Sequence, residues 1–176
     1  MFGEVKGEKI KSAISNKLYQ TFKIEDVNNP STFICDTIYK DKTPQVVVRP
    51  AFFIHILDVQ LEKRMFNQFD KAYNLVVRYE LAEYDIQNYH KLNEIGEQLF
   101  TALKQIELEI PAFYIDEKQE WHKATLPTRG TRMEYTIQDN ILHFFVTYKL
   151  RVWEDMEKEP EMKEVKTNVT KKEDEK

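Results

Sequence analysis

The chain has 176 residues, of which 41% are hydrophobic and 12% aromatic, and its formal net charge is -4. This length allows one domain with a buried core and needs no disulfide or metal, while the net acidity argues against a general basic surface for nucleic acid. The single cysteine, Cys35, excludes an internal disulfide and favours a reducing compartment, with a small buried strand residue at this position. Because there is neither a signal-peptide pattern nor an apolar run long enough to cross a bilayer, we expect a soluble intracellular protein.

The N-terminal part begins with a helical pattern and continues with extended ones. Apolar residues recur every four positions in Lys9–Phe22, which predicts a covering helix. β-branched and aromatic residues predict a strand over Thr32–Tyr39, and Pro50 is expected to precede a strand over Phe52–Leu61. That strand should begin buried on both faces and end half-exposed. One of its faces is predicted to carry Phe53, His55, Leu57, Val59 and Leu61.

The middle of the chain combines a strand with a longer helix. After a charged connection, Lys71–Leu81 alternates apolar and polar residues and predicts an amphipathic strand. The period then changes, and Asn88–Ile106 predicts a helix of about five turns whose apolar face includes Tyr89. Leu108–Ile115, interrupted by Pro111, predicts a short edge strand. Trp121 and His122 begin or cap another short strand, which a loop over residues 126–130 connects to the next element.

The C-terminal part, Arg129–Glu154, predicts a long β-hairpin. Asp139 and Asn140 form its turn, because these residues tolerate positive backbone angles. Met133, Tyr135 and Ile137 share one face of the first arm. The second arm has one apolar face and one face that changes from apolar to polar. The apolar face consists of Leu142, Phe144, Val146, Tyr148, Leu150 and Val152.

These elements together predict an α+β fold, with a mostly antiparallel sheet, a long C-terminal hairpin and two packed helices. After Trp153 the composition becomes strongly charged and loses its apolar periodicity. Such a segment cannot compensate the entropy lost on ordering. We therefore expect one domain over residues 1–154 and a disordered tail over residues 155–176.

No catalytic or cofactor signature is visible in the sequence. It contains no G-x-S-x-G, no glycine-rich phosphate loop, no C-x-x-C and no H-E-x-x-H, and it has only four glycines. The histidines lie on different predicted elements, without metal-ligand spacing: His55, His90, His122 and His143. Glu80, Glu83 and Asp85 are interpreted as favouring a helix start rather than catalysis. We expect a protein that is no enzyme and binds neither a cofactor nor a metal.

The hairpin supplies the candidate interface residues. Arg129, Gly130, Thr131 and Arg132 place two cations around a glycine. They are interpreted as a turn with solvated arginines, in which glycine provides backbone freedom, or as a contact with an acidic neighbour. The outward-facing residues of the second arm complete the candidate set: His143, Phe145, Lys149 and Arg151.

Several blocks resemble the phage tail terminator family. They are Arg129-Gly130-Thr131 with Met133 and Tyr135, Leu142–Val146 with Tyr148, Arg49–Ile54, and the strand Tyr73–Tyr79 followed by a helix ending in GEQLFTALKQI. The resemblance covers about Lys9–Trp153. The chain departs from the family at Asn140, where glycine is frequent, and at Arg132, where a small polar residue is common.

The resemblance implies a small α/β protein that forms a hexameric ring on the head-proximal end of the tail tube. This ring stops tube polymerisation and joins the neck or connector protein, or the sheath protein where the tail contracts. DNA only passes through the pore, no membrane is involved, and the protein is found in the host cytoplasm during assembly. Two alternatives stay open: another neck protein, such as a head-completion or connector component, and a small enzyme or RNA-binding module that uses its aromatic sheet.

Overall fold

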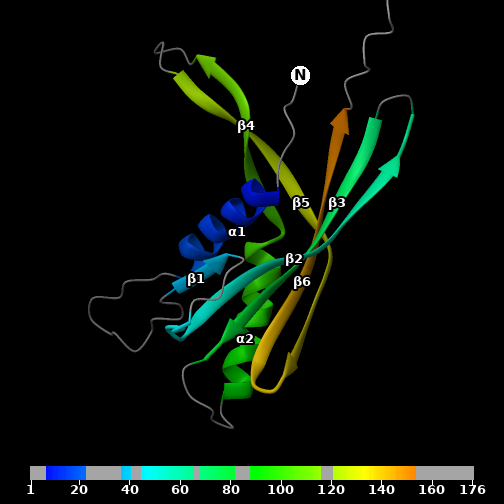
Figure 1. The fold of residues 1–176 in the computed structure, drawn as a ribbon. Helices are drawn as coiled ribbons and strands as arrows, with labels where there is room; N and C mark the ends of the chain where they lie inside the picture. The colour runs from blue at the N-terminus through cyan, green and yellow to red at the C-terminus, as the bar shows by residue number, and fades with distance from the viewer. Residues whose placement is uncertain are drawn as a thin grey trace, which may run out of the picture.

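The computed structural model describes residues 7–22, 37–40, 45–65, 68–81, 88–115 and 121–153. This part of the chain forms two helices and six strands (Figure 1). In chain order they are α1 (Gly7–Phe22), β1 (Thr37–Lys40), β2 (Ala51–Lys63), β3 (Gln68–Glu80), α2 (Asn88–Ala102), β4 (Gln105–Ile115), β5 (Trp121–Gln138) and β6 (Ile141–Trp153).

The six strands form one sheet in the order β1-β2-β3-β6-β5-β4. β1 and β2 run parallel, and every other pair of neighbours is antiparallel. Figure 1 shows that the sheet opens at one end, where β4 with the first part of β5 projects to one side and β2, β3 and β6 project to the other. The predicted α+β fold with a mostly antiparallel sheet, a long C-terminal hairpin and two helices is confirmed.

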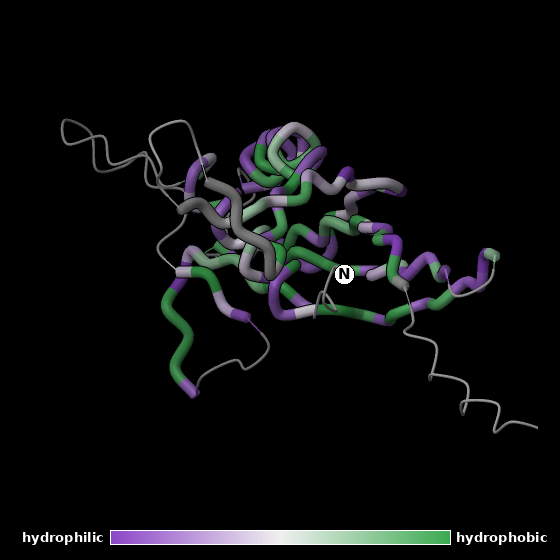
Figure 2. The backbone as a smooth tube through the Cα atoms, turned by 90° about the horizontal axis from the view of Figure 1, so that it is seen from above, coloured by the Kyte–Doolittle hydropathy of each residue, from purple (hydrophilic) through white to green (hydrophobic). Residues whose placement is uncertain are grey.

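Both helices pack on the same face of the sheet. The ring of Phe22, at the end of α1, lies 5.1 Å from that of Phe52 in β2, and the ring of Phe100 in α2 lies 5.1 Å from that of Phe144 in β6. Phe52 and Phe144 belong to one buried cluster, and Figure 2 shows hydrophobic stretches along the strands at the centre of the molecule. We call the opposite side, which carries Phe53, His55, Val76, His143 and Phe145, the outer face.

The two helices confirm the predicted periodicity, but α2 ends earlier than predicted. α1 buries the stripe expected from its four-residue spacing: Ile10, Ile14, Leu18 and Phe22. α2 ends at Ala102, so the prediction that it continues to Ile106 is wrong. Ile106 is buried in β4, because the apolar run passes from a helix directly into a strand and periodicity does not mark the boundary. Tyr89 is 55% exposed, since it lies in the first turn of α2, before the helix reaches the core with Leu92.

The predicted face of β2 is wrong beyond Ile56, because the strand contains a β-bulge. The register moves from Ile56 opposite Leu75 to Asp58 opposite Asn74, so Leu57 is an extra residue. An extra residue reverses the alternation of the strand. Phe53 and His55 therefore lie on the outer face, while Val59, opposite Tyr73, returns to the helix side. The strand begins buried on both faces, as predicted, but it ends exposed on both rather than on one.

The connection between β2 and β3 is shorter than predicted. Most of the charged residues over 62–70 extend the two strands, which pair up to Lys63 opposite Phe69. The main-chain N–H of Arg64 donates a 2.9 Å hydrogen bond to the oxygen of Gln68, which closes the hairpin. Charged residues at the end of this hairpin are therefore compatible with a β-strand, because both faces of the strand are exposed to solvent there.

The C-terminal hairpin has the predicted turn and the predicted core face. Asp139 and Asn140 have φ values of 51° and 62°, and Gln138 pairs with Ile141. Residues 142, 144, 146, 148 and 150 are buried, while Val152, predicted on the same face, is half-buried near the end of the strand. The first arm is longer than predicted, because β5 begins at Trp121 and includes residues 126–130, which were expected to be a loop. Pro127 is tolerated there since this part of β5 pairs with β4 on one side and has left β6 on the other.

β4 lies at one edge of the sheet, which confirms the prediction of an edge strand, although it already begins at Gln105. Some predictions fall outside the described residues: those for Cys35, Glu83 and Asp85, and the tail over residues 155–176. Of the strand predicted over Thr32–Tyr39, only the end at β1 is described. The domain boundary at residue 154 stays a prediction.

Candidate functional site

β5 changes its hydrogen-bonding partner at Arg129–Thr131. Arg129 is opposite Gln105 of β4, whereas Gly130 is opposite Tyr148 of β6. Of the two interpretations of this segment, the turn is wrong, because the residues lie inside a continuous strand. They form the junction from which the two projecting parts of the sheet diverge (Figure 1).

Gly130 is buried where the junction meets the end of α2. Its N–H donates a 2.9 Å hydrogen bond to the main-chain oxygen of Lys104. A Cβ atom at this position would lie 2.6 Å from the main-chain oxygen of Leu103 and 3.1 Å from Cγ2 of Val146. Its φ is not positive, so close approach and not backbone freedom explains the glycine. The structure thus gives Gly130 a packing role within the subunit.

Arg132 occupies a second bulge, directly after the junction. Its φ is 49°, and the register moves from Thr131 opposite Thr147 to Glu134 opposite Phe145. The Thr131 hydroxyl donates a 3.0 Å hydrogen bond to the main-chain oxygen of Thr147, which holds the strands together beside the bulge. Arg129 and Arg132 are exposed, and their contact with an acidic neighbour stays a prediction.

The other candidates lie along the outer face of β6. His143 and Phe145 are half-buried, while Lys149 and Arg151 are exposed. The structure brings Lys149 close to Arg132, because both line one cavity of about 110 Å³. These two cations from neighbouring strands share the cavity with the carboxylates of Glu62 and Asp70.

A chain of polar side chains crosses the outer face beside this cavity. Thr147, expected in the polar part of its strand face, is buried, and its hydroxyl donates a 2.6 Å hydrogen bond to Oδ1 of Asn74. The Asn74 amide donates to the carboxylate of Asp58. These bonds join β6, β3 and β2, so they fix the lateral positions of three strands where the helices give no support.

Further along the outer face from these hydrogen bonds, Asp70 lies between two arginines. Its Oδ2 is 2.7 Å from Nε of Arg64, and its Oδ1 is 3.3 Å from Nε of Arg151. The hydrogen bond from Arg64 lowers the pKa of Asp70 below its ordinary value, and the bond from Arg151 acts in the same direction against partial burial. Arg151 is therefore engaged within the subunit, which makes Lys149 the cleaner candidate for an external contact.

At the opposite end of β6, His143 faces a cationic neighbour. It is opposite Arg78 of β3. Burial lowers the pKa of His143, and the positive charge of Arg78 lowers it further, while Glu80 and Asp139 act in the other direction. His143 consequently favours the neutral form more than a solvated histidine does.

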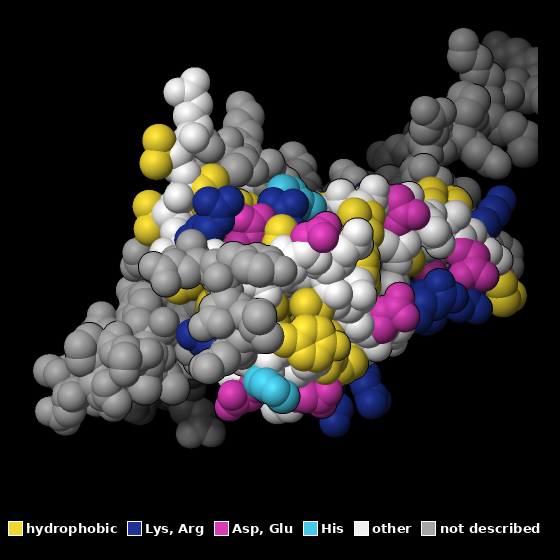
Figure 3. All heavy atoms as spheres, turned by 90° about the horizontal axis from the view of Figure 1, so that it is seen from below, with side chains coloured by type: hydrophobic (Ala, Val, Ile, Leu, Met, Phe, Trp, Pro, Cys, Tyr) yellow, Lys and Arg dark blue, Asp and Glu magenta, His cyan; other side chains and the backbone are white. Residues whose placement is uncertain are grey.

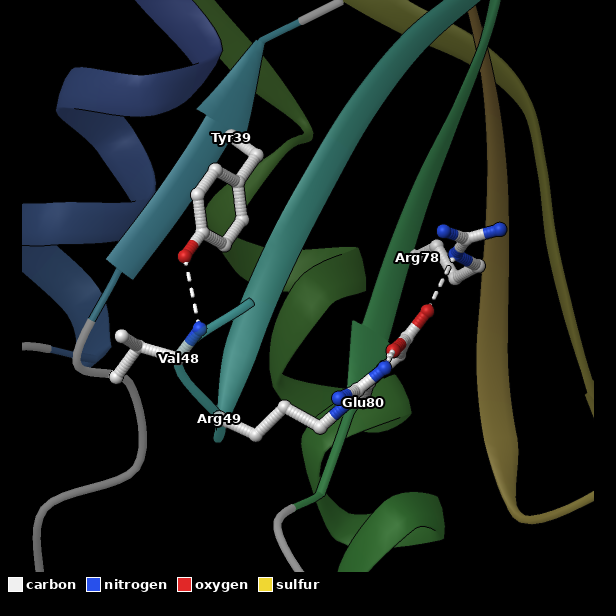
Figure 4. A network of polar contacts seen from close by, with 5 residues as sticks. All are labelled: Tyr39, Val48, Arg49, Arg78 and Glu80. Carbon is white, nitrogen blue, oxygen red and sulfur yellow. Dashed lines mark hydrogen bonds and ion pairs between the residues drawn. The ribbon is translucent and has the colours of Figure 1, made fainter. Parts of the chain in front are cut away.

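Figure 4 shows a network that the sequence analysis missed. The buried carboxylate of Glu80 accepts a 2.9 Å hydrogen bond from Nε of Arg49, and its other oxygen lies 3.0 Å from Nε of Arg78. The contact with Arg78 is an ion pair without hydrogen-bond alignment, and this guanidinium also lies over the ring of Phe53, 4.7 Å from its centre. Nearby, the N–H of Val48 donates a 3.0 Å hydrogen bond to the hydroxyl of Tyr39.

This network corrects the interpretation of Glu80 as a residue that favours a helix start. Glu80 is the last residue of β3, and α2, which begins at Asn88, has no acidic residue in its first turn. The pairing of Glu80 with Arg49 joins the entrance of β2 to the end of β3. The block Arg49–Ile54 was a signal for this role, since it places an arginine directly before a buried strand.

The comparisons with known proteins agree with the resemblance in the sequence. A family model described as phage tail terminator protein matches residues 9–160, a range that includes all six strands and nearly all of α1. The chain belongs to the phage tail terminator family. No curated protein sequence matches it. As a member of this family, the protein is a structural component of the virion tail and interacts with other tail components.

The described part of this tail terminator family member contains no group of three or more His, Cys, Asp or Glu residues that could hold a metal ion. No helix in the described ranges is long and apolar enough to cross a membrane. Figure 3 shows acidic and basic side chains interspersed with small hydrophobic patches on the face seen from below. On that face, a mixed surface suits contacts with other proteins better than binding to a polyanion.

Proposed function

We propose that this tail terminator family member forms a hexameric ring on the head-proximal end of the tail tube. The ring stops tube polymerisation and offers its free surface to the neck or connector protein, or to the sheath protein in a contractile tail. Assembly takes place in the host cytoplasm, and DNA only passes through the pore. The observation that supports this proposal most is the family match over residues 9–160.

A closed ring accounts for termination in physical terms. Head-to-tail contacts between identical subunits close into a ring when the rotation per subunit divides the circle, and a closed ring leaves no lateral site for another copy. A terminator must also differ from tube protein on its upper side, so that no further tube layer binds there. The net charge of -4 suits a pore through which DNA passes without being retained.

The outer face and the junction are the proposed contact surfaces with a neighbouring subunit or with the tube. They carry exposed cations on a rigid sheet, which positions each guanidinium or ammonium group before contact. Gly130 and Thr131 hold the junction in place, and His143 with Phe145 forms a half-buried patch. The exposed cations are Arg129, Arg132, Lys149 and Arg151.

Deletion of the gene in its phage or prophage tests the proposal. We expect tail tubes of uncontrolled length, and normal length after complementation in trans. Electron micrographs should place a ring of about six subunits at the upper end of each complemented tube. Tubes of unchanged length in the deletion would contradict termination, and finished tubes that lack heads would indicate another neck function instead.

Charge reversal at one exposed lysine, compared with a matched control, tests the proposed surface. Lys149→Glu should reduce complementation of the deletion, because Lys149 is exposed beside Arg132 on the outer face. The matched control is Lys91→Glu, which changes the same charge at an exposed position of α2, away from that face. Equal complementation by both variants would exclude Lys149 from the contact.

A further inference from the structure

The divergence of β5 from β6 leaves each strand with a partner on one side only. β6 pairs with β5 up to Tyr148, opposite Gly130, and among the described residues Lys149–Trp153 pair with β3 alone. We call Lys149–Trp153 the β6 edge. Before Gly130, β5 in turn pairs with β4 alone. Because an unpaired strand edge exposes main-chain donors and acceptors, both edges can bind a further strand.

The β6 edge is regular over its whole length. The register between β3 and β6 runs without a shift along both strands, and no proline occurs in β6. The main-chain oxygen of Thr147 accepts the hydroxyl of Thr131, so it points towards β5. Main-chain groups of alternate residues in an antiparallel strand point to the same side, and those of Arg151 therefore point to the unpaired side.

The unpaired side of β5 is limited by Pro127. Proline has no N–H, so it is tolerated at the end of a pairing but not inside a central strand. A strand added on this side can therefore pair with Trp121–Leu126, which we call the β5 edge. Figure 1 shows that β4 and this part of β5 project as a ribbon of two strands. Two strands alone are marginally stable, and a third one stabilises them.

The apolar residues of the two edges lie on matching faces. Leu126 is opposite a buried leucine of β4, and Ala124 packs on the same buried cluster, so both belong to the helix side of β5. Leu150 and Val152 belong to the helix side of β6. Leu126 is 36% exposed and Val152 is half-buried. Antiparallel pairing with Leu126 opposite Leu150 and Ala124 opposite Val152 would cover all four.

The same register also brings main-chain groups together. The N–H of Gly130 donates to the oxygen of Lys104, just before β4, so alternate residues back to Leu126 point towards β4 as well. The main-chain groups of Thr125 consequently point to the unpaired side of β5. In this register Thr125 is opposite Arg151, whose main-chain groups point to the unpaired side of β6.

We propose that the β5 edge of one subunit pairs with the β6 edge of a second copy of this chain. The two edges agree in length, apolar face and main-chain direction, but within one subunit they diverge (Figure 1). Because two different edges meet, the contact is head-to-tail and repeats from subunit to subunit until the circle closes. This inference rests on the proposed ring and names the strands that build it.

Cysteine cross-linking tests this pairing. In full-length protein with Cys35→Ser, Thr125→Cys and Arg151→Cys are expressed separately and together, and are oxidised on tail tubes. Opposite residues of an antiparallel pair have Cα atoms about 4.5–5.5 Å apart, which a disulfide can bridge. We expect a covalent dimer only after co-expression, and a ladder ending at the ring size when one chain carries both changes.

The control for cross-linking is Lys91→Cys, at an exposed position of α2, which should give no dimer with Thr125→Cys. Three results would overturn the proposal. They are dimers of either edge variant with itself, a disulfide inside one chain that carries both changes, and no dimer in any sample.

Removal of one main-chain donor provides a second measurement. Arg151→Pro removes the N–H on the unpaired side, whereas Arg151→Ala removes the same side chain, with its bond to Asp70, and keeps that N–H. We expect rings from the alanine variant and none from the proline variant, with similar unfolding midpoints. Rings from both variants, or a much lower midpoint for the proline variant, would contradict an unpaired edge at Arg151.

These results separate the strand pairing from the proposed function. Rings that form without the cross-link, on tubes of normal length, overturn the pairing and leave the terminator role in place. A wild-type protein that remains monomeric on tubes, with tube length unaffected by its deletion, overturns both.

Discussion

The hydroxyl of Tyr148 donates a 2.7 Å hydrogen bond to the main-chain oxygen of Leu103. Both groups are buried, and burial raises the pKa of the Tyr148 hydroxyl well above its ordinary value, so it remains a donor at any physiological pH. The bond ties the middle of β6 to the turn after α2. It lies beside Gly130, where β5 passes from one partner strand to the other.

Tyr148→Phe should therefore lower the free energy of unfolding by about 1–3 kcal/mol, since the oxygen of Leu103 loses a buried donor. The ring and its packing are retained. Urea denaturation followed by circular dichroism measures the change. Tyr89→Phe, at a position 55% exposed, is the matched control and should change stability by less than about 0.5 kcal/mol. Equal values for the two variants would show that the buried bond contributes nothing.

Gly130→Ala should destabilise the protein by about 1–3 kcal/mol or more, because its Cβ would lie 2.6 Å from a main-chain oxygen that cannot rotate away. Gly96→Ala is a useful comparison. There the nearest atoms, at 3.0 Å, belong to the half-buried side chain of Tyr135 and not to the main chain, and alanine favours the helix by about 1 kcal/mol. Thermal unfolding of both variants gives the order. A Gly130→Ala protein as stable as Gly96→Ala would contradict the close approach.

Glu80→Gln should cost about 1–3 kcal/mol of unfolding free energy, because Arg49 and Arg78 lose their shared anion while the shape is conserved. Added salt should shrink the difference between wild type and variant, since Arg49 is partly exposed to screening ions. Glu94→Gln, exposed on α2, serves as the control and should leave stability within about 0.5 kcal/mol. A loss that does not respond to salt would point to packing instead of charge.

Asp70→Asn should make the free energy of unfolding less dependent on pH in the acid range. The pKa of Asp70 is lower in the folded state, chiefly through Arg64, so the ionised carboxylate stabilises the fold above its ordinary pKa of about 3.9. This contribution is lost as pH falls from that value through the folded-state pKa. Chemical denaturation between pH 7 and pH 2 measures the profile.

The matched control for this profile is Asp139→Asn, which removes a carboxylate from the exposed turn and keeps a residue that tolerates positive φ. It measures what the loss of one exposed carboxylate does by itself. If the profile of Asp70→Asn does not differ from that of this control, the ion pairs of Asp70 with Arg64 and Arg151 do not stabilise the fold.

The sequence by itself determined the type of nearly every described element. The four-residue spacing of Ile10, Ile14 and Leu18 specifies a helix, and alternation specifies β3 and β6, because each period leaves one apolar face for the core. Asp139 and Asn140 located the hairpin turn through their tolerance of positive φ. The family was recognisable for the same local reason, since its blocks lie in continuous stretches of the chain.

Only the tertiary structure decided which strands meet and where their alternation reverses. The bulges at Leu57 and Arg132 depend on pairing with a distant strand, so no local pattern announces them. The packing of Gly130 against Leu103 and the pairing of Glu80 with Arg49 likewise join residues from separate elements. The period of a local sequence pattern encodes burial alone, whereas the partner and register of a strand depend on the whole sheet. For this reason the junction appeared only in the fold.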